Sequence, residues 1–359
     1  MNAERLHVIA IAIRDDFNKL NIQNILKSLV NSLQNQVSQP NQPTHQQNVS
    51  NNLQSLVVAL EKSATNDFTP AWNQVVEEIG GGEFIGNVLL EEIQSIFERN
   101  NITPSLAHEE LNEIQNELSK FLAALNPLII SFDALNIGTE QLQPGECELG
   151  VVVPRSEVDN ALPNFGKELI ELNKIFSVFS ELATGSRESF KIRTISSSDL
   201  TVFLEFLPEV AACTAISIER IIALYKQLLE IRKLKGDLEK QGVPEEGTAG
   251  IDAHANSLME RGLTGLIEEL IEKFHKNEDP GRENELRIET KYALNKLAKR
   301  IDRGYGIDVR IEPYIGDEDI DDEMPEEITN AIISASKNIQ YMKLDGDPIL
   351  TLPESSDDD

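Results

Sequence analysis

Residues 208–240 read PEVAACTAISIERIIALYKQLLEIRKLKGDLEK, and this stretch shapes the predicted fold more than any other. A series of positions in this stretch, spaced alternately four and three residues apart, would lie on one face of a helix; we call this series the seam. Most seam residues are aliphatic, which predicts one long amphipathic helix over residues 208–241. Further apolar side chains widen the stripe beyond a strict seam, so a core helix of a bundle and a dimerising coiled coil both fit. Gly242 and Pro244 then end the helix.

The chain before this helix is mostly helical in pattern. Residues 1–37 repeat apolar side chains at helical spacing and predict an N-terminal amphipathic helix, whole or in two pieces. Residues 38–52 are rich in Gln, Asn and Ser, which predicts a flexible linker. Residues 53–126 predict a helical domain, in which Thr69-Pro70 and Thr103-Pro104 each place a cap before a proline that opens a helix.

Strand patterns begin only after this helical part. Residues 127–245 predict a mixed α/β region that contains the long helix, and residues 246–352 predict a helical region that ends in strands and a hairpin at Asp345-Gly346. Residues 353–359 form an acidic tail. The short apolar or alternating runs that predict strands are Leu128–Asp133, Leu149–Val153, Phe190–Ile195 and Ile307–Ile311.

Together these patterns predict a mainly α protein with a minor β component, of the α+β class. An N-terminal helical domain would be followed by a mixed domain with a long central helix. The aromatic content is 5%, which is typical of aliphatic helix bundles.

The charge balance limits the classes of partner. The chain has 61 acidic and 32 basic residues, a formal net charge of −29, and the acidic excess is largest after residue 246. Such a field repels phosphate backbones and anionic membranes, so we expect no direct nucleic-acid or membrane binding and favour a basic protein partner. Apolar runs are too short to span a bilayer.

Cysteine usage and the short motifs indicate no cofactor. Cys147 and Cys213 lack any metal-ligand spacing, which predicts a reducing, cytoplasmic location. Other partial matches are better explained as ordinary helix or loop chemistry. They are the Glu-x-x-His pairs Glu4/His7 and Glu272/His275, the Ser-x-x-Lys pair Ser334/Lys337, and the glycines at 80–82.

The preferred function is therefore a non-catalytic interaction protein, an adaptor or regulatory subunit that binds a protein partner or itself. Two features carry this prediction: the apolar seam of the long helix and the acidic run near residue 320. The predicted interaction residues are Ile221, Leu224, Leu228 and Ile231 in the seam, and Asp317, Asp319, Asp321 and Asp322 in the acidic run.

Two alternatives belong to other classes. The first is a metal-dependent hydrolase, similar in chemistry to a phosphodiesterase, with its site at the strands of residues 128–195. Its candidate carboxylates border predicted strands and are Asp133, Glu146, Glu148 and Glu168. The second is an acidic mimic of a nucleic-acid backbone, which would bind a basic protein in a salt-sensitive manner.

Overall fold

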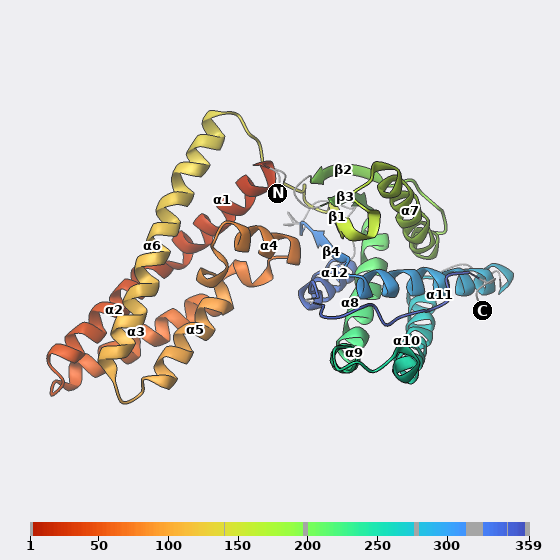
Figure 1. The fold of residues 1–359 in the computed structure, drawn as a ribbon. Helices are drawn as coiled ribbons and strands as arrows, with labels where there is room; N and C mark the ends of the chain where they lie inside the picture. The colour runs from red at the N-terminus through yellow and green to blue at the C-terminus, as the bar shows by residue number, and fades with distance from the viewer. Residues whose placement is uncertain are drawn as a thin grey trace. The chain divides into compact units, whose positions relative to one another are not determined.

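The computed structural model describes residues 3–139, 141–196, 200–275, 280–313, 326–342 and 344–355. The chain divides into two compact units, Met1–Gln141 and Leu142–Asp359. Helices dominate both units, and one small antiparallel sheet lies in the second, so the predicted mainly α class with a minor β component is confirmed (Figure 1).

The described residues of the first unit form helices and turns and no strand. Its elements are α1 (Ala3–Leu20), α2 (Ile22–Ser38), α3 (Pro43–Glu61), η1 (Ala64–Asp67), α4 (Pro70–Glu78), η2 (Gly82–Phe84), α5 (Gly86–Arg99) and α6 (Pro104–Ala134). Asn21 divides α1 from α2 in the left-handed conformation, which Asn tolerates well. The aliphatic stripes of these helices meet in one core, where Ile9, Leu26 and Leu56 are fully buried.

The second unit combines the sheet with a helical core. Its elements are β1 (Cys147–Val153), η3 (Arg155–Val158), α7 (Leu162–Thr184), β2 (Lys191–Ser196), β3 (Leu200–Phe206), α8 (Pro208–Lys226), α9 (Leu229–Lys240), α10 (Glu245–Phe274), α11 (Pro280–Asp302), β4 (Gly306–Ile311) and α12 (Glu326–Asn338). The strand order is β2-β3-β1-β4 and every pairing is antiparallel.

Helix α8 lies at the centre of this unit. It contacts α7, α10, α11 and α12 as well as strands β1 and β4. Every residue from Val210 to Ile218 is buried, so this helix has no solvent-facing side over more than two turns. One face of the sheet joins the same core through Leu149, Val151 and their neighbours across the strands.

Two predicted segments have a different structure in the first unit. The flexible linker over residues 38–52 is wrong, because α3 begins at Pro43 and only a short turn precedes it. Its polar side chains are largely exposed, while Val49 reaches the core, so a polar composition here marks a surface helix. The strand predicted at Leu128–Asp133 is also wrong, since α6 continues through Pro127 to Ala134 with Leu125 and Ile129 buried on one face.

Two further corrections concern the second unit. The single helix over residues 208–241 is interrupted, because the amides of Gln227 and Leu228 bond three residues back and tighten the turn between α8 and α9. The hairpin at Asp345-Gly346 does not form: Gly346 has a positive φ of 81°, but the described residues on either side belong to no strand. Instead, the carbonyls of Asp345 and Gly346 accept hydrogen bonds from the side chain of Arg232 on α9.

Candidate functional site

A cleft of about 770 Å³ lies between α5 and α6 in the first unit. The apolar residues of its lining, which we call the floor, are Phe84, Val88, Ile96 and Ile114. The acidic side chains that surround this floor are Glu83, Glu91, Glu92, Glu110, Glu113 and Glu117. Arg99 is the one basic residue of the lining, so six carboxylates face a single guanidinium.

Helical periodicity explains why these glutamates converge. On α5, Val88, Glu91, Glu92 and Arg99 recur at spacings of three, four and seven residues, which places them on one face. On α6, Glu110, Glu113, Ile114 and Glu117 repeat the same spacing. The opposite faces of both helices supply core residues, so packing turns the two acidic faces toward a common space.

Arg99 links α5 to α6 by hydrogen bonds to a glutamate on each helix. Its Nη2 donates to Glu92 Oε1 at 2.8 Å and its Nε donates to Glu110 Oε2 at 2.9 Å. Asn100 Nδ2 donates to the second oxygen of Glu110 at 2.9 Å. These hydrogen bonds, first from Arg99 and then from Asn100, lower the pKa of Glu110, so this carboxylate stays charged at neutral pH.

Most of the remaining acidic charge of the cleft lacks a nearby cation among the described residues. Lys120 pairs with Glu117 at 2.6 Å, but both side chains are exposed and such a pair contributes little to stability. Glu83, Glu91 and Glu113 are exposed and pair with no cation among the described residues. The cleft therefore combines an apolar floor with uncompensated negative charge.

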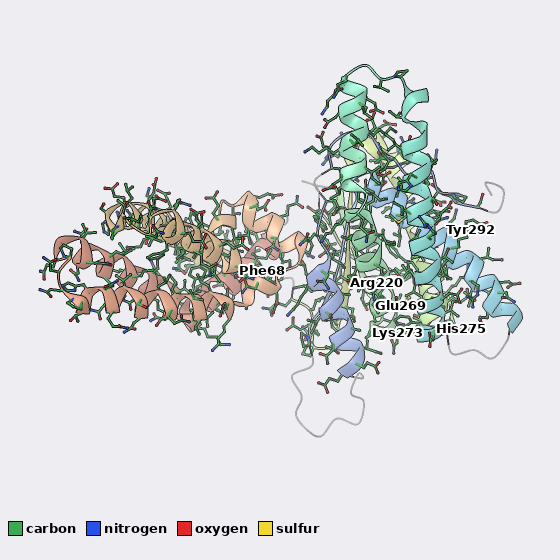
Figure 2. The ribbon with its side chains drawn as sticks, turned by 90° about the horizontal axis from the view of Figure 1, so that it is seen from below. Phe68, Arg220, Glu269, Lys273, His275 and Tyr292 are labelled. Carbon is green, nitrogen blue, oxygen red and sulfur yellow. The ribbon has the colours of Figure 1, made fainter. Side chains whose placement is uncertain are left out.

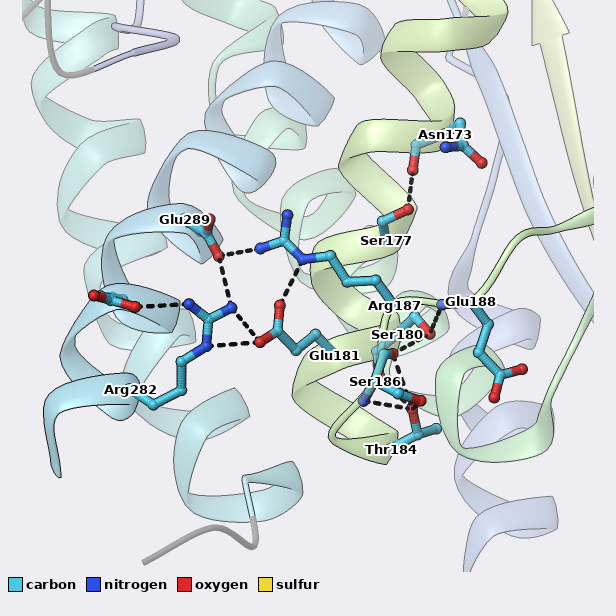
Figure 3. Close-up of polar contacts among 11 residues, drawn as sticks. Asn173, Ser177, Ser180, Glu181, Thr184, Ser186, Arg187, Glu188, Arg282 and Glu289 are labelled. Carbon is cyan, nitrogen blue, oxygen red and sulfur yellow. Dashed lines mark hydrogen bonds and ion pairs between the residues drawn. The ribbon is translucent and has the colours of Figure 1, made fainter. Parts of the chain in front are cut away.

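A second cleft, of about 630 Å³, lies in the second unit beside an ion network. Glu181 on α7 accepts from Arg187 Nε at 2.5 Å and also pairs with Arg282 on α11, and Glu289 contacts both arginines (Figure 3). Burial alone would raise the pKa of Glu181, but the hydrogen bonds from the two arginines outweigh it and lower the pKa. The charges in this network compensate one another, so we interpret it as a set of structural ion pairs that links α7 to α11.

The seam residues predicted for partner binding lie within the second unit. Ile221 and Leu228 are buried in its core, and Leu224 and Ile231 pack against that core. A methyl group added at Gly262 on α10 would come within 2.4 Å of Leu224, which shows how closely the two helices pack. These side chains are used inside the chain and do not form a free surface.

The predicted acidic run lies where the structure gives no description. Asp317, Asp319, Asp321 and Asp322 fall outside the described residues.

The candidate hydrolase carboxylates are only partly brought together. Glu146 and Glu148 both lie near Arg193. Glu146 Oε2 is 2.9 Å from Arg193 Nη2, and Glu148 Oε1 is 3.9 Å from Nη2 of a second arginine, Arg310. Glu168 is held by Arg300 at 2.6 Å, and Asp133 belongs to the first unit, 3.4 Å from His7. Among the described residues, no three acidic, His or Cys side chains group as metal ligands do.

The other motif residues also have structural explanations. His7 is buried and its Nδ1 lies 2.8 Å from the carbonyl of Ile137, whereas Glu4 is exposed. His275, labelled in Figure 2, follows the end of α10. Glu272 is exposed on that helix. Ser334 and Lys337 are both exposed on α12.

The two cysteines are free thiols inside the second unit. Burial, with smaller contributions from Glu209 and Glu146, raises the pKa of Cys147 to about 12. Burial also raises the pKa of Cys213. A buried thiol with a raised pKa is a poor nucleophile at neutral pH.

Sequence reasoning placed α5 and α6 but missed the cleft between them. The signal was present as Glu residues at helical spacing on two consecutive helices, each opposite an apolar stripe. Which of those polar faces would meet depends on how the helices pack, and no local pattern reports that.

Comparison of the chain with protein-family models, curated proteins and solved structures finds no match. No helix in the described part of the chain has the length and apolar character needed to cross a membrane. The fold and the cleft themselves are therefore the basis for a functional proposal.

Proposed function

We propose that this protein is a non-catalytic interaction protein, an adaptor or regulatory subunit, whose α5/α6 cleft binds a basic amphipathic segment of a protein partner. The observation that carries the proposal is a cleft lining of six glutamates and one arginine beside the apolar floor. Aliphatic side chains of the partner would cover that floor, and its lysines or arginines would meet the exposed carboxylates.

The charge of the whole chain supports the same class of partner. A formal net charge of −29 raises the rate at which a basic segment encounters the surface, and salt weakens this steering. The free, buried thiols fit a cytoplasmic location, which we propose as the setting of this interaction.

A designed peptide tests the proposal directly. The probe is a fluorescent helical peptide of lysine and leucine, compared with a counterpart in which glutamate replaces lysine. We expect the full chain to bind the lysine peptide, to bind the glutamate peptide far more weakly, and to lose affinity as salt rises from about 50 to 200 mM.

A pair of matched variants locates the binding. Glu91→Lys with Glu113→Lys reverses two exposed charges in the cleft, whereas Glu98→Lys with Glu109→Lys makes the same change on exposed positions of the same helices outside it. We expect the first pair to weaken binding at least tenfold and the second to change it by much less. Equal losses in both pairs would show a diffuse charge effect and overturn the cleft as the site.

A further inference from the structure

Residues 344–354 cross the surface of the second unit as an extended segment, which we call the strap. Three of its side chains are almost fully buried: Ile349 is 1% exposed, Leu350 4% and Leu352 1%. Residues 345–348 and Thr351 are exposed between and before these anchors. The strap thus lies on the surface and inserts three aliphatic side chains. Figure 1 shows its backbone as the dark-blue coil beyond α12.

Side chains from α10 and α11 bind the backbone of the strap. Asn256 on α10 donates to the carbonyl of Ile349 at 3.2 Å and accepts from the amide of Thr351 at 2.8 Å. Asn295 on α11 donates to the carbonyl of Pro353 at 2.8 Å. An asparagine that both donates to and accepts from one extended chain recognises the chain's peptide groups and not its side chains.

Asp302, at the end of α11, recognises the backbone in the same way. Its Oδ2 accepts from the amides of Ile349 and Leu350 at 2.8 and 2.7 Å, and its side chain is completely buried. Arg232 on α9 compensates this buried charge, with Nη1 2.9 Å from Asp302 Oδ1. The hydroxyl of Tyr225 also donates to Asp302 Oδ1. A buried carboxylate needs such partners to remain charged.

Arg232 also binds the start of the strap. Its Nε donates to the carbonyl of Asp345 at 3.1 Å and its Nη2 donates to the carbonyl of Gly346 at 2.5 Å. Gly346 turns the chain with a positive φ of 81° and lies against Gly236 on α9. A side chain here would be strained, which explains glycine at this position.

The contacts of the strap are of two kinds, hydrogen bonds to its backbone and burial of its side chains, as in a peptide-binding groove. Side chains from three helices read backbone groups at Asp345, Gly346 and from Ile349 to Pro353. The strap itself contributes three aliphatic anchors. Main-chain hydrogen bonds together with pockets for a few side chains are how grooves bind extended peptides.

We propose that the groove formed by α9, α10 and α11 is a binding site for an extended peptide, which the strap occupies within this chain. A partner peptide would compete for it if it carries the same pattern: two adjacent aliphatic residues, any residue, a third aliphatic residue and then proline. This inference does not rest on the α5/α6 cleft. The strap has the advantage of being tethered, which gives it an effective concentration of about millimolar.

The test removes that tether in the full chain. A protease recognition sequence inserted between Lys343 and Leu344 allows cleavage after folding, so that the strap is held only by its own contacts. A fluorescent peptide with the sequence of residues 344–355 is then added in excess. We expect it to replace the cut strap, seen as a rise in fluorescence anisotropy. A peptide with aspartate in place of Ile349 and Leu352 should fail to bind.

Matched variants check the groove. Asn256→Ala removes both hydrogen bonds to the strap and should weaken the labelled peptide about tenfold, whereas Asn284→Ala changes an exposed position on α11 and should leave binding unchanged. Two outcomes would overturn the proposal: a cut strap that never exchanges while the protein stays folded, or exchange conditions that collapse the helicity of the protein. Either would make residues 344–354 a permanent part of the core.

Discussion

Glu181 illustrates how single charged residues are accommodated in the second unit. Its side chain is 12% exposed, and two arginines from different parts of the chain, Arg187 and Arg282, donate to it. Burial to this extent would normally favour the neutral acid. The paired arginines reverse that preference and lower the pKa of Glu181, so the folded state depends on its charge.

We therefore predict that Glu181→Gln destabilises the protein by about 1–3 kcal/mol at pH 7. Because the folded pKa is lowered, the contribution of the charge is present above the unfolded value of about 4.3 and is lost as the pH falls through the folded pKa. Urea denaturation at pH 7 and at lower pH should show the difference between wild type and variant shrinking in acid.

Glu188→Gln is the matched control, because Glu188 is exposed near the same network (Figure 3). We expect this variant to change stability by less than about 0.5 kcal/mol. A difference for Glu181→Gln that stays constant with pH would contradict the assignment of its effect to charge.

At the scale of elements, the start of α5 depends on one glycine. Gly86 has a positive φ of 47° and follows η2. Asn66 holds this junction, since its Oδ1 accepts from the amide of Asn87 at 2.7 Å and its Nδ2 donates to the carbonyl of Leu60 at 2.8 Å. A Cβ atom on Gly86 would lie 2.1 Å from Asn66 Oδ1, so the backbone approaches too closely for any other residue.

Gly86→Ala should therefore destabilise the protein by at least about 1–3 kcal/mol, the usual cost of a left-handed non-glycine residue, with the clash in addition. Urea denaturation monitored by the helical signal measures this change. Gly138→Ala is the control in the same unit, because its Cβ would meet no atom within 4 Å. Equal effects of the two substitutions would show that the junction carries no special constraint.

At the scale of the whole molecule, each unit has its own core. The first unit closes around residues from Leu6 to Ile129, and the second around residues from Cys147 to Leu352, with no residue shared. A domain with a separate core is expected to fold alone. The division falls between Gln141 and Leu142.

We predict that a fragment of residues 1–141 folds independently. Circular dichroism should show a helical spectrum and a cooperative urea transition, as expected for a small single domain. A helical signal that declines gradually, without a cooperative transition, would show that the first unit requires the rest of the chain.

Much of the secondary structure was predictable because its signals are local. The helices within residues 53–126 and strands β1, β2 and β4 all follow from periodicity and turn residues. The errors arose where packing in the folded chain outweighed the preference of the local sequence. Pro127 predicts the end of a helix, yet α6 continues because Leu125 and Ile129 are buried on one face.

The candidate sites were much less predictable than the elements. The seam containing Ile221 and Leu228 has the same pattern whether a partner or another helix of the chain covers it. Asp302, Arg232 and Asn256 are separated by long stretches of sequence and meet only at the strap. Such clusters leave no sequence spacing from which they could be inferred.

By itself, the sequence determined the mainly α class, the positions of most helices and the strong acidity, because helical period, capping and charge are properties of neighbouring residues. Only the tertiary structure decided that the glutamates of α5 and α6 share a cleft, that α8 is core, and that side chains of α9, α10 and α11 bind the backbone of residues 344–354. The reason is that packing between distant segments selects which faces meet, and many packings are compatible with one local pattern.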